Sequence, residues 1–179
     1  MSDEPRHTAD AWPIARSRPA ACVAYAACGL TLAYGVLKFY WAVGGTALRG
    51  TIGFPEEVWR DPWFVALGLW GTVVLSFVGA LVAFAFVRPW GRRIPRRMLL
   101  IPAWAACALL TARGVGGLAH DGLLVTGFIG APASVGLSVI LWDLAHYSPY
   151  FAVWGVLLGS TAWYFDRDSG RSERWERST

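Results

Sequence analysis

An unbroken run of 25 uncharged residues, from Trp63 to Val87, constrains this chain more than any other feature of its sequence. A helix of that length is about 37 Å long, which exceeds the roughly 30 Å of a bilayer's hydrocarbon core. Asp61 and Pro62 precede the run and are typical of a helix N-cap followed by the first helical position. The run therefore predicts a membrane-spanning helix over residues 63–87.

The overall composition supports a membrane protein. Of the 179 residues, 55% are hydrophobic and only 16% are charged, whereas a soluble domain usually carries about a quarter charged residues. This excludes soluble globular and disordered classes, and three cysteines are too few for a disulfide framework. We expect an all-α polytopic protein, with a transmembrane domain over residues 20–165 between an N-terminal segment, 1–19, and a tail, 166–179.

Three further apolar segments predict helices over residues 20–45, 98–118 and 149–165. The first follows two arginines, as a cleaved signal peptide does, but it is too long and ends in bulky aromatic residues, so we interpret it as an anchoring helix. The last begins at Ser148 and Pro149, which predict a second N-cap.

The segment over residues 122–142 is also uncharged, but three glycines and Pro132 interrupt it. We interpret it as an apolar outer segment, re-entrant or interfacial, with a fifth span as the alternative. The even number of crossings given by four helices keeps the arginine-bearing tail on the same side as the N-terminal segment.

The distribution of arginine predicts the orientation. The loop between the second and third helices contains five arginines and no acid, which is typical of a cytoplasmic loop. These arginines are Arg88, Arg92, Arg93, Arg96 and Arg97. We therefore expect both termini and this loop on the cytoplasmic side of the membrane. The net charge of +4 resides in short segments between apolar runs, so we expect the lipid bilayer, and no nucleic acid, as a partner.

Two cations lie within the predicted spans, Lys38 and Arg113, both near the outer ends of their helices. Each either reaches lipid headgroups or faces the bundle interior, where it needs a polar partner such as Asp121, Asp143 or Tyr40. The second alternative predicts a polar and aromatic ligand pocket in the outer half of the bundle. Its candidate residues are Lys38, Tyr40, Trp41, Arg113, Trp142 and Asp143.

Histidines and carboxylates also gather on the predicted outer side, at His120, Asp121, Asp143 and His146. Their spacing matches no known ligand signature, so we expect no metal and no cofactor. Small residues four apart predict helix-packing faces instead, at Gly155 with Gly159 and at Ser76 with Ala80. The cysteines are expected to be small core residues.

Three stretches carry a resemblance to a known family: Phe39-Tyr40-Trp41-Ala42-Val43-Gly44-Gly45, the arginine-rich loop over residues 87–97, and Leu141-Trp142-Asp143. Over about residues 20–165 the chain resembles a family of uncharacterised four-span bacterial integral membrane proteins, common in actinobacteria. Residues 144–148 depart from the family's pattern. The resemblance implies an inner-membrane location and no established activity.

We expect a non-enzymatic four-helix bundle whose extracytoplasmic side binds a lipid headgroup or another membrane protein. The alternative is an intramembrane enzyme acting on a lipid or isoprenoid substrate, with Asp143, His146 and His120 in acid–base or metal-binding roles. A transporter component is a third hypothesis, which the absence of any carboxylate from the most certain spans disfavours.

Overall fold

The computed structural model describes residues 18–130 and 135–176. Most of the expected N-terminal segment, Pro132 of the outer segment and the last three residues of the tail lie outside the described residues. The helical elements are α2 (Arg18–Ala42), η2 (Arg49–Thr51), α3 (Glu56–Arg60), η3 (Phe64–Gly71), α4 (Thr72–Ala85), η4 (Pro89–Arg93), α5 (Arg96–Val125), α6 (Leu137–Trp142), η5 (Asp143–Tyr147) and α7 (Ser148–Glu176). Within the described ranges there is no strand, so the all-α prediction is confirmed.

Three helical segments are long and apolar enough to cross a membrane: Arg18–Ala42, Phe64–Ala85 and Arg96–Val125. The second of these lies within the uncharged run and starts one residue after its first residue, Trp63. Phe64 N–H donates a 2.8 Å hydrogen bond to the Asp61 carboxylate, so the expected N-cap is confirmed. Helix α7 is less apolar, because Ser, Thr, Trp and Tyr recur through its uncharged part, residues 148–165.

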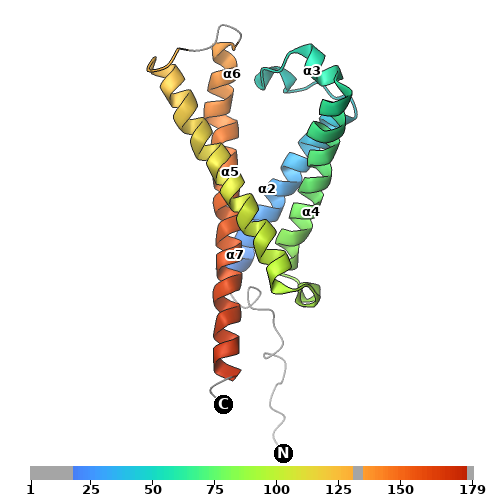
Figure 1. Ribbon diagram of the computed structural model, residues 1–179, viewed down its shortest axis with the longest axis vertical. Coiled ribbons are helices and arrows are strands. Elements are labelled where there is room, and N and C mark those ends of the chain that lie inside the picture. Colours follow the sequence, from blue (N-terminus) through green and yellow to red (C-terminus); the bar gives the residue numbers. More distant parts are fainter. Residues whose placement is uncertain (1–17, 131–134, 177–179) are drawn as a thin grey trace, which may run out of the picture.

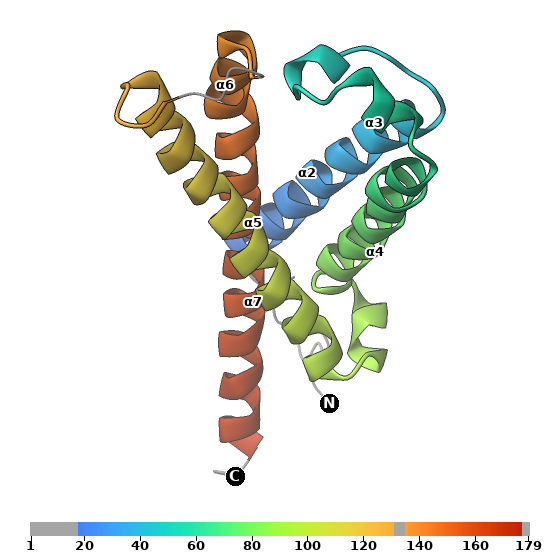
Figure 2. The same ribbon diagram turned by 45° about the horizontal axis from the view of Figure 1, so that its top comes forward.

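The long helices form two hairpins, α2 with α4 and α5 with α7, and α2 also packs against α7. Figure 1 shows the hairpins close together at one end and diverging toward the other, and Figure 2 shows the same divergence from a second angle. The start of α2, the segment η4 and the end of α7 lie at the end where the hairpins meet. The helix-connecting segments around α3 and α6 lie at the diverging end.

Glycines hold the α5–α7 hairpin together at close range. A Cβ added at Gly114 would lie 2.3 Å from the backbone nitrogen of Ala152, and one at Gly155 would lie 2.4 Å from the Thr111 hydroxyl. Gly159 faces Cys107 in the same way. Gly155 and Gly159 therefore form the packing face that their spacing predicts.

Small residues also pack α2 against α4, where a Cβ on Gly35 would lie 3.0 Å from the Cβ of Ser76. The cysteines only partly meet the expectation of core positions. Cys28 and Cys107 are half-buried, but Cys22 is exposed, because it lies on the outward-facing side of α2.

Hydrogen bonds between α2 and α7 join the two hairpins in the middle of the bundle. The indole N–H of Trp154 donates a 2.9 Å hydrogen bond to the Thr31 hydroxyl, and both residues are buried. The Tyr150 hydroxyl donates to the Leu30 carbonyl. These bonds satisfy the polar tips of aromatic side chains whose rings are packed in the interior.

The second hairpin differs from the sequence-based expectation at the diverging end. Helix α5 continues seven residues past the expected end at residue 118, to Val125, and residues 137–142 form helix α6. The chain then stays helical through η5, a π-helical turn, into α7. The expected N-cap at Ser148 is wrong, because this residue has helical backbone angles, φ −64° and ψ −47°.

The π-helical turn explains how the helix continues into Pro149. In a regular α-helix the proline ring would press against the carbonyl of Ala145, four residues earlier. A π-helical turn is wider, and here Ser148 N–H donates to the carbonyl of Asp143, five residues earlier. The widened turn therefore lets one helical rod run from Leu137 to Glu176.

Candidate functional site

The polar centre of the diverging half of the bundle is formed by Arg113, Asp143 and Ser148. Arg113 Nη2 donates a 2.7 Å hydrogen bond to Asp143 Oδ1, and its Nη1 lies 3.4 Å from Asp143 Oδ2. The Ser148 hydroxyl donates to Asp143 Oδ2 at 2.7 Å and accepts from Arg113 Nη1 at 3.3 Å. The structure thus gives Arg113 the carboxylate partner that a cation in an apolar helix requires.

The surrounding backbone makes room for this cluster. Gly117 lies one helical turn after Arg113, and a Cβ there would lie 2.1 Å from Ser148 Oγ and 2.4 Å from Arg113 Nη1. Real Cβ atoms do not approach other atoms that closely. A glycine at this position therefore lets the guanidinium and the hydroxyl reach the same carboxylate.

The protonation of Asp143 is set by its neighbours. Burial alone would raise the pKa of its carboxyl, but hydrogen bonds from Arg113 and Ser148, the neighbouring Asp121 and the charge of Arg113 lower that pKa below its ordinary value. Asp143 is therefore ionised at neutral pH, as the carboxylate partner of Arg113.

Lys38 lies on the opposite hairpin and has aromatic neighbours. Its Nζ lies 5.3 Å from the centre of the Tyr34 ring and 4.9 Å from that of Trp41. These are distances at which ring faces attract cations. Within the described ranges no carboxylate lies at ion-pair distance from Lys38.

Tyr34 and Phe151 connect the two cations. Their ring centres are 5.4 Å apart in an edge-to-face arrangement, and the Arg113 guanidinium carbon lies 5.5 Å from the centre of the Phe151 ring. We name Lys38, Tyr34, Phe151 and Arg113 the cation–aromatic cluster. It contains residues from α2, α5 and α7, so it spans both hairpins.

Tyr40 and Trp41 pack within the first hairpin and are not in contact with Arg113. Trp41 is buried, packs against Trp59 and Leu69, and donates its indole N–H to the Ala47 carbonyl at 2.8 Å. The ring of Tyr40 lies where a Cβ on Gly45 would be, and Gly44 has a left-handed backbone, φ +100°. The Tyr-Trp-x-x-Gly-Gly element is therefore a helix-terminating turn covered by an aromatic ring.

The two histidines among the described residues have different nearest partners. His120 Nδ1 lies 3.0 Å from Asp121 Oδ1, and the His146 ring lies 4.4 Å from the Trp142 ring. In the part of the chain that the structure describes, no three His, Cys, Asp or Glu side chains are grouped to hold a metal. Among the described residues, Asp143, His146 and His120 are therefore not part of such a metal-holding group.

One contact at the outermost end was not foreseen from the sequence. The hydroxyls of Thr51 and Tyr147 share a hydrogen bond of 2.7 Å, and a Cβ on Gly53 would lie 2.9 Å from Val139. The outer loop of the first hairpin thus touches α6 and η5 of the second. Neither Thr51 nor Tyr147 carries a sequence signal, because their contact depends on how the hairpins are packed.

The comparison with protein families matches residues 31–158, more than half of the chain, to a protein family of unknown function, DUF3995. This chain belongs to the DUF3995 family. Searches of curated proteins and of solved structures found no significant match.

The DUF3995 match takes in the whole outer half of the bundle. It begins at Thr31, which accepts the hydrogen bond from Trp154, and ends at Leu158 in α7. The cation–aromatic cluster and the Arg113–Asp143 pair both lie inside the DUF3995 region. The arginine-rich loop lies inside it as well.

Proposed function

We propose that this DUF3995 protein is a multi-pass protein of a bacterial cytoplasmic membrane that crosses the bilayer four times, with both termini on the cytoplasmic side. Three helices with the length and hydropathy of membrane spans support it, and α7 supplies an uncharged fourth stretch over residues 148–165. Four crossings return the chain to its starting side. This agrees with the start of α2 and the end of α7 lying at one end of the bundle.

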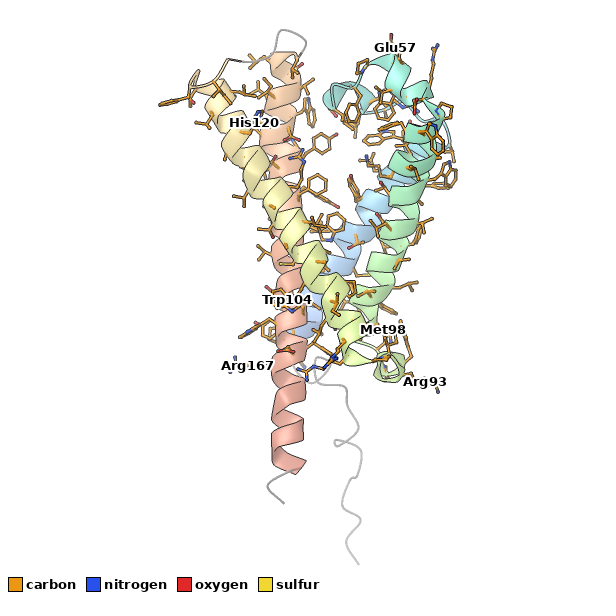
Figure 3. All side chains as sticks on the ribbon, viewed as in Figure 1. Glu57, Arg93, Met98, Trp104, His120 and Arg167 are labelled. Carbon is orange, nitrogen blue, oxygen red and sulfur yellow. The ribbon has the colours of Figure 1, made fainter. Side chains whose placement is uncertain are left out.

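The charges at the two ends of the bundle support the orientation. Figure 3 shows Arg93 and Arg167 at the end where the hairpins meet, and Glu57 and His120 at the diverging end. Arginine-rich ends stay in the cytoplasm. The diverging end, with the candidate site, is therefore assigned to the outer side.

The cation–aromatic cluster supports a function in binding an anionic phospholipid at that outer side, without enzymatic chemistry. Lys38 lies about 30 Å along α2 from Arg18, which is the thickness of the hydrocarbon core. Its amino group is therefore at headgroup depth. Next to it, Val36 and Phe39 are exposed apolar side chains of the kind that contact acyl chains.

The single observation that carries the lipid proposal is the charge of Lys38. It is half-buried against rings, and the described residues provide no carboxylate for it. Arg113 lies across the Tyr34–Phe151 pair, and its side chain keeps 47% of its surface exposed in spite of the pairing with Asp143. Two cations around an aromatic pair at headgroup depth suit a phosphate group.

Retention of phosphatidylglycerol tests this function. The purified protein is mixed with equal amounts of phosphatidylglycerol and phosphatidylcholine in detergent, and bound lipid is counted by native mass spectrometry. We expect wild type to retain phosphatidylglycerol preferentially and Lys38→Gln to lose most of that preference. Arg60→Gln is the matched control, because Arg60 is an exposed cation on α3 at the same end of the protein.

The control variant should behave as wild type. The lipid proposal would be contradicted if a Lys38→Gln variant with the melting temperature of wild type retained as much phosphatidylglycerol as wild type. An equal loss in both variants would contradict it as well, because a general surface charge would then explain binding.

A further inference from the structure

Asp121 is a buried acid whose hydrogen bonding is incomplete. Its side chain is 10% exposed, and its Oδ1 lies 3.0 Å from His120 Nδ1. Its Oδ2 is buried and receives no hydrogen bond from an N–H or O–H donor of the described residues. An ionised carboxylate oxygen that is buried without a donor is strongly unfavourable, whereas a protonated carboxyl needs only an acceptor.

An acceptor is close by, because the carboxyl groups of Asp121 and Asp143 are neighbours that interact with each other. Two carboxyl groups can share a hydrogen bond only when one of them carries a proton. The buried Oδ2 of Asp121, which receives no donor, fits a proton between the two groups, and the donors around each residue indicate which one holds it.

The distribution of donors assigns the proton to Asp121. Asp143 already receives hydrogen bonds from Arg113 and Ser148 and is paired with a full positive charge. Asp121 has only His120, whose side chain is 61% exposed, and is itself less exposed than Asp143, at 10% against 22%. The ionised form is thus stabilised at Asp143 and the neutral form at Asp121.

The charge balance of the surroundings points the same way. With Asp121 neutral, one carboxylate faces one guanidinium; with Asp121 ionised, two carboxylates would face it. Helix α6 contributes no titratable group to this region. The titratable and charged groups on the elements packed around Asp121 are Arg113 and His120 on α5, Asp143, His146 and Tyr147 on η5, and Tyr150 on α7.

We infer that Asp121 and Asp143 form a proton-binding site at the outer end of α5, in which Asp121 holds a proton at neutral pH and donates it in a hydrogen bond to the Asp143 carboxylate. The ligand is a single proton from the aqueous phase, and no other bond is made or broken. This site does not depend on lipid binding. Release of the proton would leave two adjacent carboxylates beside Arg113.

Infrared spectroscopy detects this proton directly. The full chain is measured in a maltoside detergent, which has no carbonyl group, as difference spectra between wild type and variants in water and in heavy water. At neutral pH we expect Asp121→Asn to remove one protonated-carboxyl band per chain, and that band to shift in heavy water. Raising the pH should abolish it in wild type.

Asp166→Asn is the control, because Asp166 is an exposed acid paired with Arg96 and precedes Arg167, which Figure 3 shows at the opposite end of the protein from His120. It should leave the band unchanged. If wild type shows no protonated-carboxyl band at neutral pH, Asp121 is ionised, as it would be beside a charged His120, and the inference is wrong. A band that persists in Asp121→Asn overturns it equally, and the wild-type spectrum decides even where the variant does not fold.

Discussion

The Ser148 hydroxyl donates a 2.7 Å hydrogen bond to the carboxylate of Asp143, which lies five residues earlier in the same helix. In a regular α-helix the residues that share a face are three or four apart. The π-helical turn η5 brings residues five apart onto one face, and Arg113 then reaches both side chains. A local irregularity of the helix thus builds the polar centre of the outer half.

The ionised state of Asp143 should make the protein's stability depend on pH. The pKa of Asp143 is lower in the folded protein than its ordinary value of 3.8, so folding favours the carboxylate. Its contribution is complete above that ordinary value and is lost as the pH falls through the lower folded value. We expect Asp143→Asn to cost about 1 kcal/mol at neutral pH, a small effect because water screens the half-exposed Arg113.

This dependence is measured as the difference in melting temperature between Asp121→Asn and the double variant Asp121→Asn/Asp143→Asn. With Asn at position 121, Asp143 is the only one of the two carboxyl groups that can titrate. The difference should be constant between about pH 8 and pH 5 and should shrink below about pH 4. If the difference in melting temperature instead grew as the solution is acidified, folding would raise the pKa of Asp143 rather than lower it, contrary to this prediction.

The close approach at Gly117 predicts opposite results for two neighbouring glycines. In Gly117→Ala the new methyl group would displace Ser148 Oγ and Arg113 Nη1. We expect a loss of about 1–2 kcal/mol of stability as the hydrogen bonds to Asp143 weaken. Gly116→Ala is the control, because a Cβ there has no neighbour within 4 Å.

The Gly116 variant should melt at or slightly above the wild-type temperature, because alanine is the better helix former. Thermal melting followed by tryptophan fluorescence compares the two. Equal melting temperatures for both variants would mean that Arg113 and Ser148 do not occupy the space beside Gly117.

The bond between Trp154 and Thr31 predicts coupling between α2 and α7. Trp154→Phe and Thr31→Val each remove one partner of the 2.9 Å hydrogen bond. We expect each to lower stability by about 1 kcal/mol, in the range of helix–helix hydrogen bonds in membranes. The double variant should lose less than the sum of the two single losses. Strict additivity in that cycle would show that the two side chains do not interact.

Much of the architecture was predictable from local sequence signals. The uncharged run over residues 63–87, the cap at Asp61 and the small residues at Gly155 and Gly159 each act within one helix or one helix pair. For Arg113 two alternatives were open at the level of sequence, lipid headgroups or a polar partner such as Asp121 or Asp143. Asp143 is that partner.

Features that depend on helix register or on contacts between hairpins were not predictable. Ser148 followed by proline has the chemistry of an N-cap, and only the π-helical turn makes it a partner of Asp143. Tyr34 and Phe151 look like ordinary core aromatics in the sequence. Their place between Lys38 and Arg113 follows from the packing of α2 against α7.

Every assignment of an inner and an outer side depends on the proposed four-crossing topology. Reporter fusions measure this topology most directly. Alkaline phosphatase, active only outside the cytoplasm, and green fluorescent protein, fluorescent only inside it, are fused after Gly53, after Arg93 and after Thr179. Four crossings predict phosphatase activity for the fusion after Gly53 and fluorescence for the other two. Fusions that place the arginine-rich loop and the carboxyl terminus on opposite sides of the membrane would contradict it.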